Sequence, residues 1–289
     1  MGRKARFWLL ALGLFGSVTA HAASPVWALH GDHNTVYLAG SVHLLKAAES
    51  TLPPGFDRAY KGSKAIVMEL AIDKVDPMAT ASWMMENGML QEGTTLRDKI
   101  GEERYRRVSK EAERLGVPTE AIDMMQPWVV GLQLIEMQYM KLGYDPQSGV
   151  EQQLQHKAQA DGKPISGLET MDEQLGVLQG MSNADQARFL DMVVDEMHDV
   201  GGETQSVVNA WRSGDAGKLS ALLGDEYKSF PNLYRLLVSE RNKRWVPQIE
   251  KLLHGSQDAF VVVGALHLVG DGGLLEILRR DGFKAEQLN

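Results

Sequence analysis

Hydrophobic and polar positions follow a strand-like pattern near both ends of the chain and a helical period in the middle. PVWALHGDHNTVYLAG (residues 25–40) places apolar flanks around the turn residues 31–34, which predicts a β-hairpin. Short apolar runs predict further strands in AIVMEL (65–70), KPISGLE (163–169), DAFVVVGALHLVG (258–270) and FKAEQLN (283–289). From Asp76 to about Leu253, apolar residues recur mostly every three or four positions, so this part is expected to be mainly helical.

Two of these strands end in the pattern Gly-x-x-His, first in LAGSVHLL and again in VVVGALHLVG. Residues 36–70 and 260–288 share one order of apolar strand, Gly-x-x-His, loop, amphipathic helix, glycine and further strand. The pattern predicts an α/β fold with a mixed central sheet, built from two strand-loop-helix-strand units. A large, mainly helical insertion at about 76–253 covers the cleft.

The two units, side by side in one sheet, bring His43 and His267 to the edge where ligands usually bind in open α/β sheets. We expect the two side chains within about 8 Å of each other or of a shared ion. Imidazole is both a common metal ligand and a general base near neutral pH. Ser41, two residues before His43, leaves open a serine nucleophile, although Ala265 stands at the matching place in the second motif.

Residues 1–22 have a basic start, an apolar middle and the small-x-small end Ala20-His21-Ala22, which together predict a secretory signal peptide. Its apolar stretch is too short to span a bilayer. We therefore expect an exported protein, periplasmic or secreted, with no stable membrane anchor after cleavage before Ala23. The region 23–289 is expected to form a single domain.

Net charge and residue composition limit the ligands and the catalytic groups that the protein can use. Removing the signal peptide takes away Arg3, Lys4 and Arg6 and no acidic residue, so the net charge moves from −8 to −11. Such a surface disfavours binding to nucleic acid. The chain has no cysteine, which excludes disulfides, thiolate nucleophiles and cysteine-ligated zinc. A metal would have to be held by histidine nitrogens and carboxylate oxygens.

Two glutamates are the first candidates to complete a metal site with the histidines. Glu69 follows the apolar run Ile66-Val67-Met68, where a carboxylate is costly unless it is paired or coordinated. Glu169 stands at a strand-to-helix junction, just before a capping box formed by Thr170 and Glu173. Either glutamate can also act as a general base, and the sequence does not distinguish the ligand from the base.

Several segments together resemble the TraB/GumN family, which is related to the Tiki proteases. They are AGSVH, VMEL, GYDPQSGVEQQLQHKAQADGKPISGLET, SERNKRW and VVVGALHLVGDGGLLEIL, and the resemblance extends from about Val36 to Phe283. It implies a metal-dependent hydrolase fold whose site contains both histidines of the Gly-x-x-His motifs and acidic residues. Animal members act as membrane-tethered metalloproteases, but this chain shows no transmembrane helix after its predicted signal peptide.

The resemblance also implies roles for residues that the hydrophobic pattern alone does not assign. Arg241 and Asn242 match the Arg-Asn pair of the family and are expected to be catalytic, with Arg241 binding a substrate carboxylate or a developing oxyanion. Asp145 matches a Gly-Tyr/Phe-Asp stretch and is expected to fix the tautomer of a ligand histidine. Glu69 and Glu169 match the acids of the VMEL and LET segments.

The leading expectation is an exported hydrolase that uses a divalent metal, manganese, cobalt or zinc, and cleaves peptide bonds. His43, His267, Glu69 and Glu169 are the predicted metal ligands, and Glu69, Arg241 and Asn242 the predicted catalytic residues. The alternatives are a non-catalytic exported protein that binds haem or a metal, and an esterase for small molecules.

Overall fold

The computed structural model describes residues 23–197, 200–228 and 230–289. The predicted signal peptide, residues 1–22, lies outside the described residues. In the part that is described, no helix is both long and apolar enough to cross a membrane.

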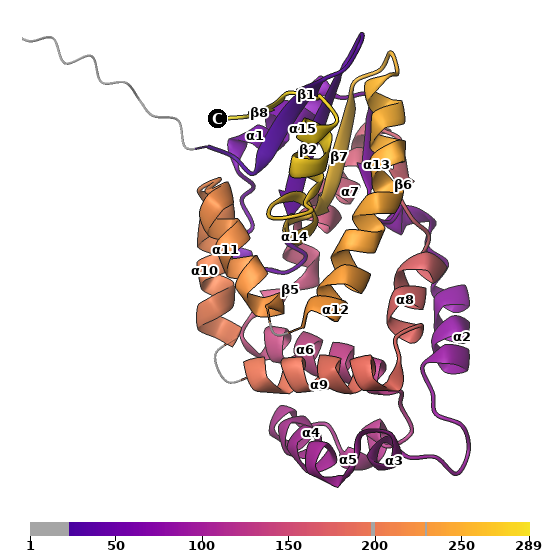
Figure 1. The fold of residues 1–289 in the computed structure, drawn as a ribbon. Helices are drawn as coiled ribbons and strands as arrows, with labels where there is room; N and C mark the ends of the chain where they lie inside the picture. The colour runs from indigo at the N-terminus through magenta and orange to yellow at the C-terminus, as the bar shows by residue number, and fades with distance from the viewer. Residues whose placement is uncertain (1–22, 198–199, 229) are drawn as a thin grey trace, which may run out of the picture.

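A six-stranded sheet forms the upper part of the molecule in Figure 1, with strand order β6-β4-β7-β2-β1-β8. The strands are β1 (Val26–His30), β2 (Thr35–Ser41), β4 (Ala65–Met68), β6 (Ile165–Gly167), β7 (Ala259–Gly264) and β8 (Ala285–Gln287). The four strands β6, β4, β7 and β2 are parallel, whereas β1 is antiparallel to both of its neighbours, β2 and β8. The predicted mixed central sheet is therefore confirmed.

The predicted hairpin is formed by β1 and β2, with Val26 opposite Ala39 and His30 opposite Thr35. The side chain of Asn34 fixes the turn by donating hydrogen bonds to the backbone carbonyls of Leu252 and Gln257. The hairpin is thus attached to the segment that leads into β7.

Strand β7 lies at the centre of the sheet, and all six of its residues are buried. Its unbroken apolar sequence fits this place, because a parallel strand covered on both faces has no polar side to show. The first predicted unit runs from β2 through α1 (Pro54–Gly62) to β4 and so crosses β7. The second runs from β7 through α15 (Leu274–Arg280) to β8, which pairs with β1.

Helices make up most of the segment between β4 and β7, as expected. Their bounds are α2 (Pro77–Asn87), α3 (Leu96–Ile100), α4 (Glu102–Leu115), α5 (Thr119–Ile122), α6 (Pro127–Lys141), α7 (Val150–Asp161), α8 (Met171–Gln179), α9 (Asn183–Glu196), α10 (Val200–Arg212), α11 (Ala216–Tyr227), α12 (Pro231–Tyr234) and α13 (Glu240–Leu253). One helical turn, α14 (Ala265–Leu268), follows β7 directly. A short ribbon joins β3 (Leu45–Lys46) to β5 (Tyr144–Asp145).

The buried apolar side chains form two clusters. One surrounds the sheet and includes Phe56, Trp245 and Phe260, and the other joins α4, α6 and α9 around Trp128 and Leu190. In Figure 1 the second cluster corresponds to the helical layer below the sheet. Part of the insertion therefore has a core of its own, whereas α7, α10, α11 and α13 bury apolar side chains against the sheet.

Candidate functional site

The carboxyl ends of β2, β4 and β7 meet at one edge of the sheet because the three strands are parallel neighbours. A Cβ atom placed on Gly264 would lie 3.2 Å from Glu69 Oε1, 3.4 Å from His43 Nε2 and 3.7 Å from His267 Cδ2. These contacts bring the two imidazoles within the expected span of about 8 Å. The structure thus brings together both histidines and the first predicted glutamate.

Both glycines of the motifs stand where another chain segment approaches closely. A Cβ on Gly40 would lie 3.2 Å from the Cα of Ala265. Gly264 has an ordinary φ of −51°, so its role is to leave space and not to adopt a left-handed conformation. The register pairs Gly40 with Val263 and Ser41 with Gly264, so the two motifs are offset by one residue.

His267 is buried on the turn α14 and its ring is held on both sides. Its ring lies against Trp245, with ring centroids 4.5 Å apart, and its Nδ1 is 2.8 Å from Asn242 Oδ1. The amide nitrogen of Asn242 donates to the carbonyls of His267 and Gly272, so Oδ1 must be the acceptor. His267 therefore carries its proton on Nδ1, and Nε2 presents a lone pair.

The electrostatic environment of His267 agrees with this tautomer. Burial lowers the pKa of His267 to about 4, because the cost of burying a cation outweighs the attraction of Glu69, and the positive charges of Arg241 and His43 lower the pKa further. The ring is thus neutral at neutral pH, and Nε2 accepts a hydrogen bond from Arg241 Nη1 at 2.9 Å.

Arg241 connects the predicted acids to His267. Its Nη2 lies 2.5 Å from Glu69 Oε2 and 2.6 Å from Glu169 Oε1, and its Nε lies 3.1 Å from Glu169 Oε1. The residue follows a π-helical turn, Arg235–Ser239, of a kind that often occurs at functional sites. The guanidinium is thus committed to holding the carboxylates in place and is not free to bind a substrate carboxylate.

Glu69 is ionised although it is almost fully buried. Burial would raise the pKa of Glu69, but the charge that His267 gains below about pH 4, the charges of Arg241 and His43, and the amide of Gly264 together lower it to about 2. The Gly264 N–H donates to Oε1 at 2.7 Å. Gln174 on α8 donates to both Glu69 and Glu169, at 3.3 and 3.1 Å, which closes the network.

His43 lies in a bend after β2, and its side chain is 65% exposed. Its Nδ1 lies 2.8 Å from Glu151 Oε1, and the negative charge of Glu151 raises the pKa of His43 to about 9. Ser41 donates its hydroxyl proton to the same carboxylate and not to the imidazole. A serine nucleophile activated by His43 would need the opposite arrangement.

Glu151 was not among the predicted site residues, and Asp145 does not have its expected role. Asp145 is exposed and accepts a hydrogen bond from the backbone of Gln147, while Glu151 is the described residue that fixes the ring of His43. The loop brings Glu151 in because Gly149 packs against the backbone of His43, leaving no room for a Cβ. The sequence Gly149-Val150-Glu151 could have indicated this contact, because a glycine that allows close backbone approach stands two residues before a carboxylate.

The donor atoms fit a divalent ion only in part. Both histidines have Nδ1 fixed by an acceptor and Nε2 turned into the site, which is the usual arrangement of metal-ligating imidazoles. Glu169 fits less well, because both of its oxygens accept hydrogen bonds from Arg241. Among the described residues no three His, Asp or Glu side chains form a ready-made ion site. Both oxygens of Glu69 are engaged as well, Oε1 by the Gly264 N–H and Oε2 by Arg241, so an ion would have to replace one of these bonds. His43, whose pKa is raised, would first have to lose a proton, and His267 would have to lose its bond from Arg241.

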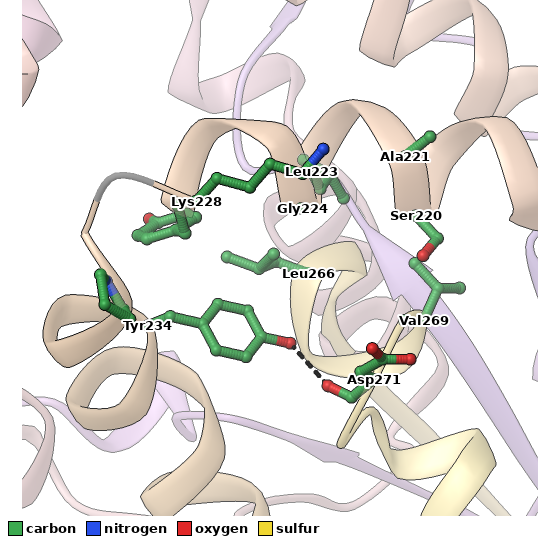
Figure 2. A pocket seen from close by; sticks show the side chains of 12 residues that line it. Ser220, Ala221, Leu223, Gly224, Lys228, Tyr234, Leu266, Val269 and Asp271 are labelled. Atoms are coloured by element: carbon green, nitrogen blue, oxygen red, sulfur yellow. Dashed lines mark hydrogen bonds between the residues drawn. The ribbon is translucent and has the colours of Figure 1, made fainter.

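One cavity adjoins the first Gly-x-x-His motif and another adjoins the second. One, of about 310 Å³, is lined by His43, Glu69 and Glu151 together with apolar side chains such as Leu70 and Ile72. The other, of about 460 Å³, lies between α11, α12 and α14, and Figure 2 shows Leu266 pointing into it. Its rim is closed by a hydrogen bond from the Tyr234 hydroxyl to the carbonyl of Asp271. Of the predicted site residues, His43 and Glu69 line the first cavity.

The sequence profile of the TraB/PrgY/gumN family matches residues 25–287, nearly the whole described chain. The chain belongs to this family. The earlier resemblance is thereby confirmed, and it places the two histidine strands, the helical segment and the Arg-Asn pair within one family domain.

Similar chains are known from two enteric bacteria. The chain is 24% identical over 269 residues to uncharacterized protein YbaP of Escherichia coli strain K12, covering 88% of this chain and 97% of the relative. It is 25% identical over the same length to uncharacterized protein YbaP of Shigella flexneri, with the same coverage. No solved structure matches the chain.

Proposed function

We propose that the protein is an exported hydrolase that uses a divalent metal ion to cleave peptide bonds. The observation that carries the proposal is the convergence of His43, Glu69 and His267 in front of Gly264, at the carboxyl edge of the sheet. The cavity lined by His43 and Glu69 combines ionised groups with apolar walls, as ligand sites usually do.

His43 and Glu69 would hold the ion, with His267 as a further ligand, and the nitrogen and oxygen donor set suits zinc, manganese or cobalt. When bound, such an ion acts as a Lewis acid and lowers the pKa of water. Glu151 keeps the proton on His43 Nδ1, and Asn242 does the same for His267, so that both Nε2 atoms face the site.

The remaining groups position charge and move protons. Glu69 or Glu151 accepts a proton as water adds to the scissile carbonyl carbon, and that proton passes to the amine as the C–N bond breaks. Arg241 holds Glu69 at 2.5 Å, and its positive charge stabilises the negative charge that develops nearby. Asn242 has no free donor for substrate, so we assign it the task of orienting His267.

Metal analysis and turnover should be measured on the same sample. Protein purified without chelators or a histidine tag is expected to contain one equivalent of metal and to cleave members of a peptide library. Activity should fall with chelator and return with manganese, cobalt or zinc. Metal-free protein that cleaves as fast as the loaded protein would contradict the proposal. Tight binding of haem or metal without turnover would favour the binding-protein alternative.

Export is a separate part of the proposal and has its own test. The mature N-terminus is expected at Ala23 or within a few residues of it, measured by mass spectrometry of periplasmic or secreted protein. Recovery of the full-length chain from the inner membrane would contradict it without touching the hydrolase assignment.

A further inference from the structure

The cavity that contains His43 and Glu69 has a second hollow beside it. This neighbour measures about 520 Å³ and lies between the segment after β4, the start of α2 and the start of α8. Leu70 lines both hollows, and Glu169 lines the neighbour one residue before the capping residue Thr170 of α8. The two hollows therefore meet at Leu70.

One wall of the second hollow is the start of α2, where Ala79 and Thr80 line it. None of the described residues of α2 is buried, although its sequence is PMATASWMMEN. Met78 and Met85 are 76% and 69% exposed. Trp83 and Met84 on its inner side pack against the helical cluster, with the rings of Trp83 and Trp128 6.1 Å apart, so Met78 and Met85 mark the outer, exposed side. In Figure 1, α2 stands beside α8 at the rim of the molecule, where a bound chain could cover it.

The charges around the second hollow restrict what can bind there. Lys74 is occupied, because its ammonium donates to the carbonyl of Ile165 at 2.7 Å. Asp76, Asp172 and Glu173 line the same hollow and leave carboxylates in excess. An acidic side chain would be repelled at this rim, whereas apolar and basic side chains are compatible with it.

We propose that the two hollows form one continuous site for an extended polypeptide segment. The bond to be cleaved lies at His43 and Glu69, and residues on one side of it occupy the hollow between α2 and α8, where apolar or basic side chains are preferred. This inference rests on the proposed function, since it names the substrate as a chain longer than a dipeptide. A small ester or a single amino acid would fill the first cavity only.

The substitution Ala79→Trp tests the inference, because Ala79 lines the second hollow, is exposed, and lies outside the His43 cavity. Wild-type protein should cleave an octapeptide with a lower KM than a dipeptide of the same cleavage sequence. Ala79→Trp should raise the octapeptide KM about tenfold, the loss of about 1.4 kcal/mol of binding, while dipeptide cleavage stays unchanged. An octapeptide with lysine in the neighbouring position should be preferred to one with glutamate.

Ala221→Trp is the matched control. It makes the same alanine-to-tryptophan change at an exposed position in the hollow of about 460 Å³ between α11, α12 and α14, which shares no lining residue with either part of the proposed site, and should change neither KM. Equal KM values for dipeptide and octapeptide in the wild type, or equal losses in both tryptophan variants, would overturn the inference.

Binding of a fluorescein-labelled octapeptide is measured in parallel by anisotropy, with the same variants, so that the result does not depend on turnover. Octapeptide binding that Ala79→Trp weakens, without cleavage of any peptide, would support the extended site and reject the hydrolase. Cleavage that depends neither on peptide length nor on Ala79→Trp would support the hydrolase and reject the extended site.

Discussion

The two Gly-x-x-His motifs have the same spacing but give their histidines opposite environments. His43 sits in an exposed bend beside the carboxylate of Glu151, which raises its pKa to about 9. His267 sits on a buried helical turn between Trp245 and Arg241, where burial lowers its pKa to about 4. The motif therefore fixes where an imidazole stands at the sheet edge, and residues from other elements decide whether it carries a proton.

The largest expected effect on the free energy of unfolding comes from the buried network around His267. Arg241→Met should lower the free energy of unfolding by about 3–5 kcal/mol, because it leaves Glu69 and Glu169 without their buried cation. Urea denaturation followed by circular dichroism measures the loss. Arg244→Met is the control, since that side chain is 45% exposed and 3.7 Å from Glu169, and should cost less than about 1 kcal/mol. Similar losses in both variants would contradict the central place of Arg241.

Replacing each histidine by alanine separates the two motifs directly. His267→Ala should destabilise the fold by about 1–3 kcal/mol, because Asn242 and Arg241 lose a buried partner. Measured above about pH 9, where the raised pKa of His43 no longer contributes stability, His43→Ala should change stability by no more than about 0.5 kcal/mol, as expected at an exposed position. Both variants should lose metal and hydrolysis. Metal analysis and urea denaturation on the same samples check this. Equal losses of stability in the two variants would contradict the different environments of the two histidines.

The pH dependence of stability should show the same contrast with opposite signs. The raised pKa of His43 gives stability that is present below about pH 6.5 and is lost as the pH rises towards about 9. The lowered pKa of His267 gives stability that is present above about pH 6.5 and is lost as the pH falls towards about 4. His43→Ala should flatten the alkaline limb of the unfolding curve and His267→Ala the acidic limb. Urea denaturation across this pH range would refute the assignment if the limbs were exchanged.

The smallest expected effect concerns the partner of His43. Glu151→Gln should lower the pKa of His43 towards its ordinary value of about 6.5, because it removes the negative charge beside Nδ1. Asp145→Ala should leave that pKa unchanged, since Asp145 bonds to the backbone of Gln147. Titration of the imidazole signals by nuclear magnetic resonance distinguishes the two. A shift in the Asp145 variant and none in the Glu151 variant would restore the original prediction for Asp145.

Much of the sheet could be predicted because its strands carry their signals locally. The apolar run of β7 and the hairpin of β1 and β2 are visible in single short segments, and parallel pairing then brings His43 near His267. Glu69 could be predicted for the same reason, since a carboxylate at the end of a buried strand needs a partner. The strand order was not visible, because pairing of β7 between β2 and β4 joins segments about two hundred residues apart.

The proton state of the site could not be predicted from spacing. It depends on which of several acids lies beside each ring, and this is settled by loops and helix faces from distant segments. Glu151 reaches His43 because Gly149 allows contact with its backbone, and the π-helical turn before α13 directs Arg241 to both glutamates. A local pattern contains neither fact.

The central place of β7 also sets an order of events during synthesis. Strands β2 and β4 leave the ribosome early, but each pairs with β7, which begins only at Ala259. The sheet therefore cannot close until nearly the whole chain has been made, and its contacts span the long sequence separations that slow folding. The helical layer around Trp128 has no such dependence, and it can collapse first. During translation, a nascent chain could therefore contain a folded helical layer while β2 and β4 still lack their partner β7.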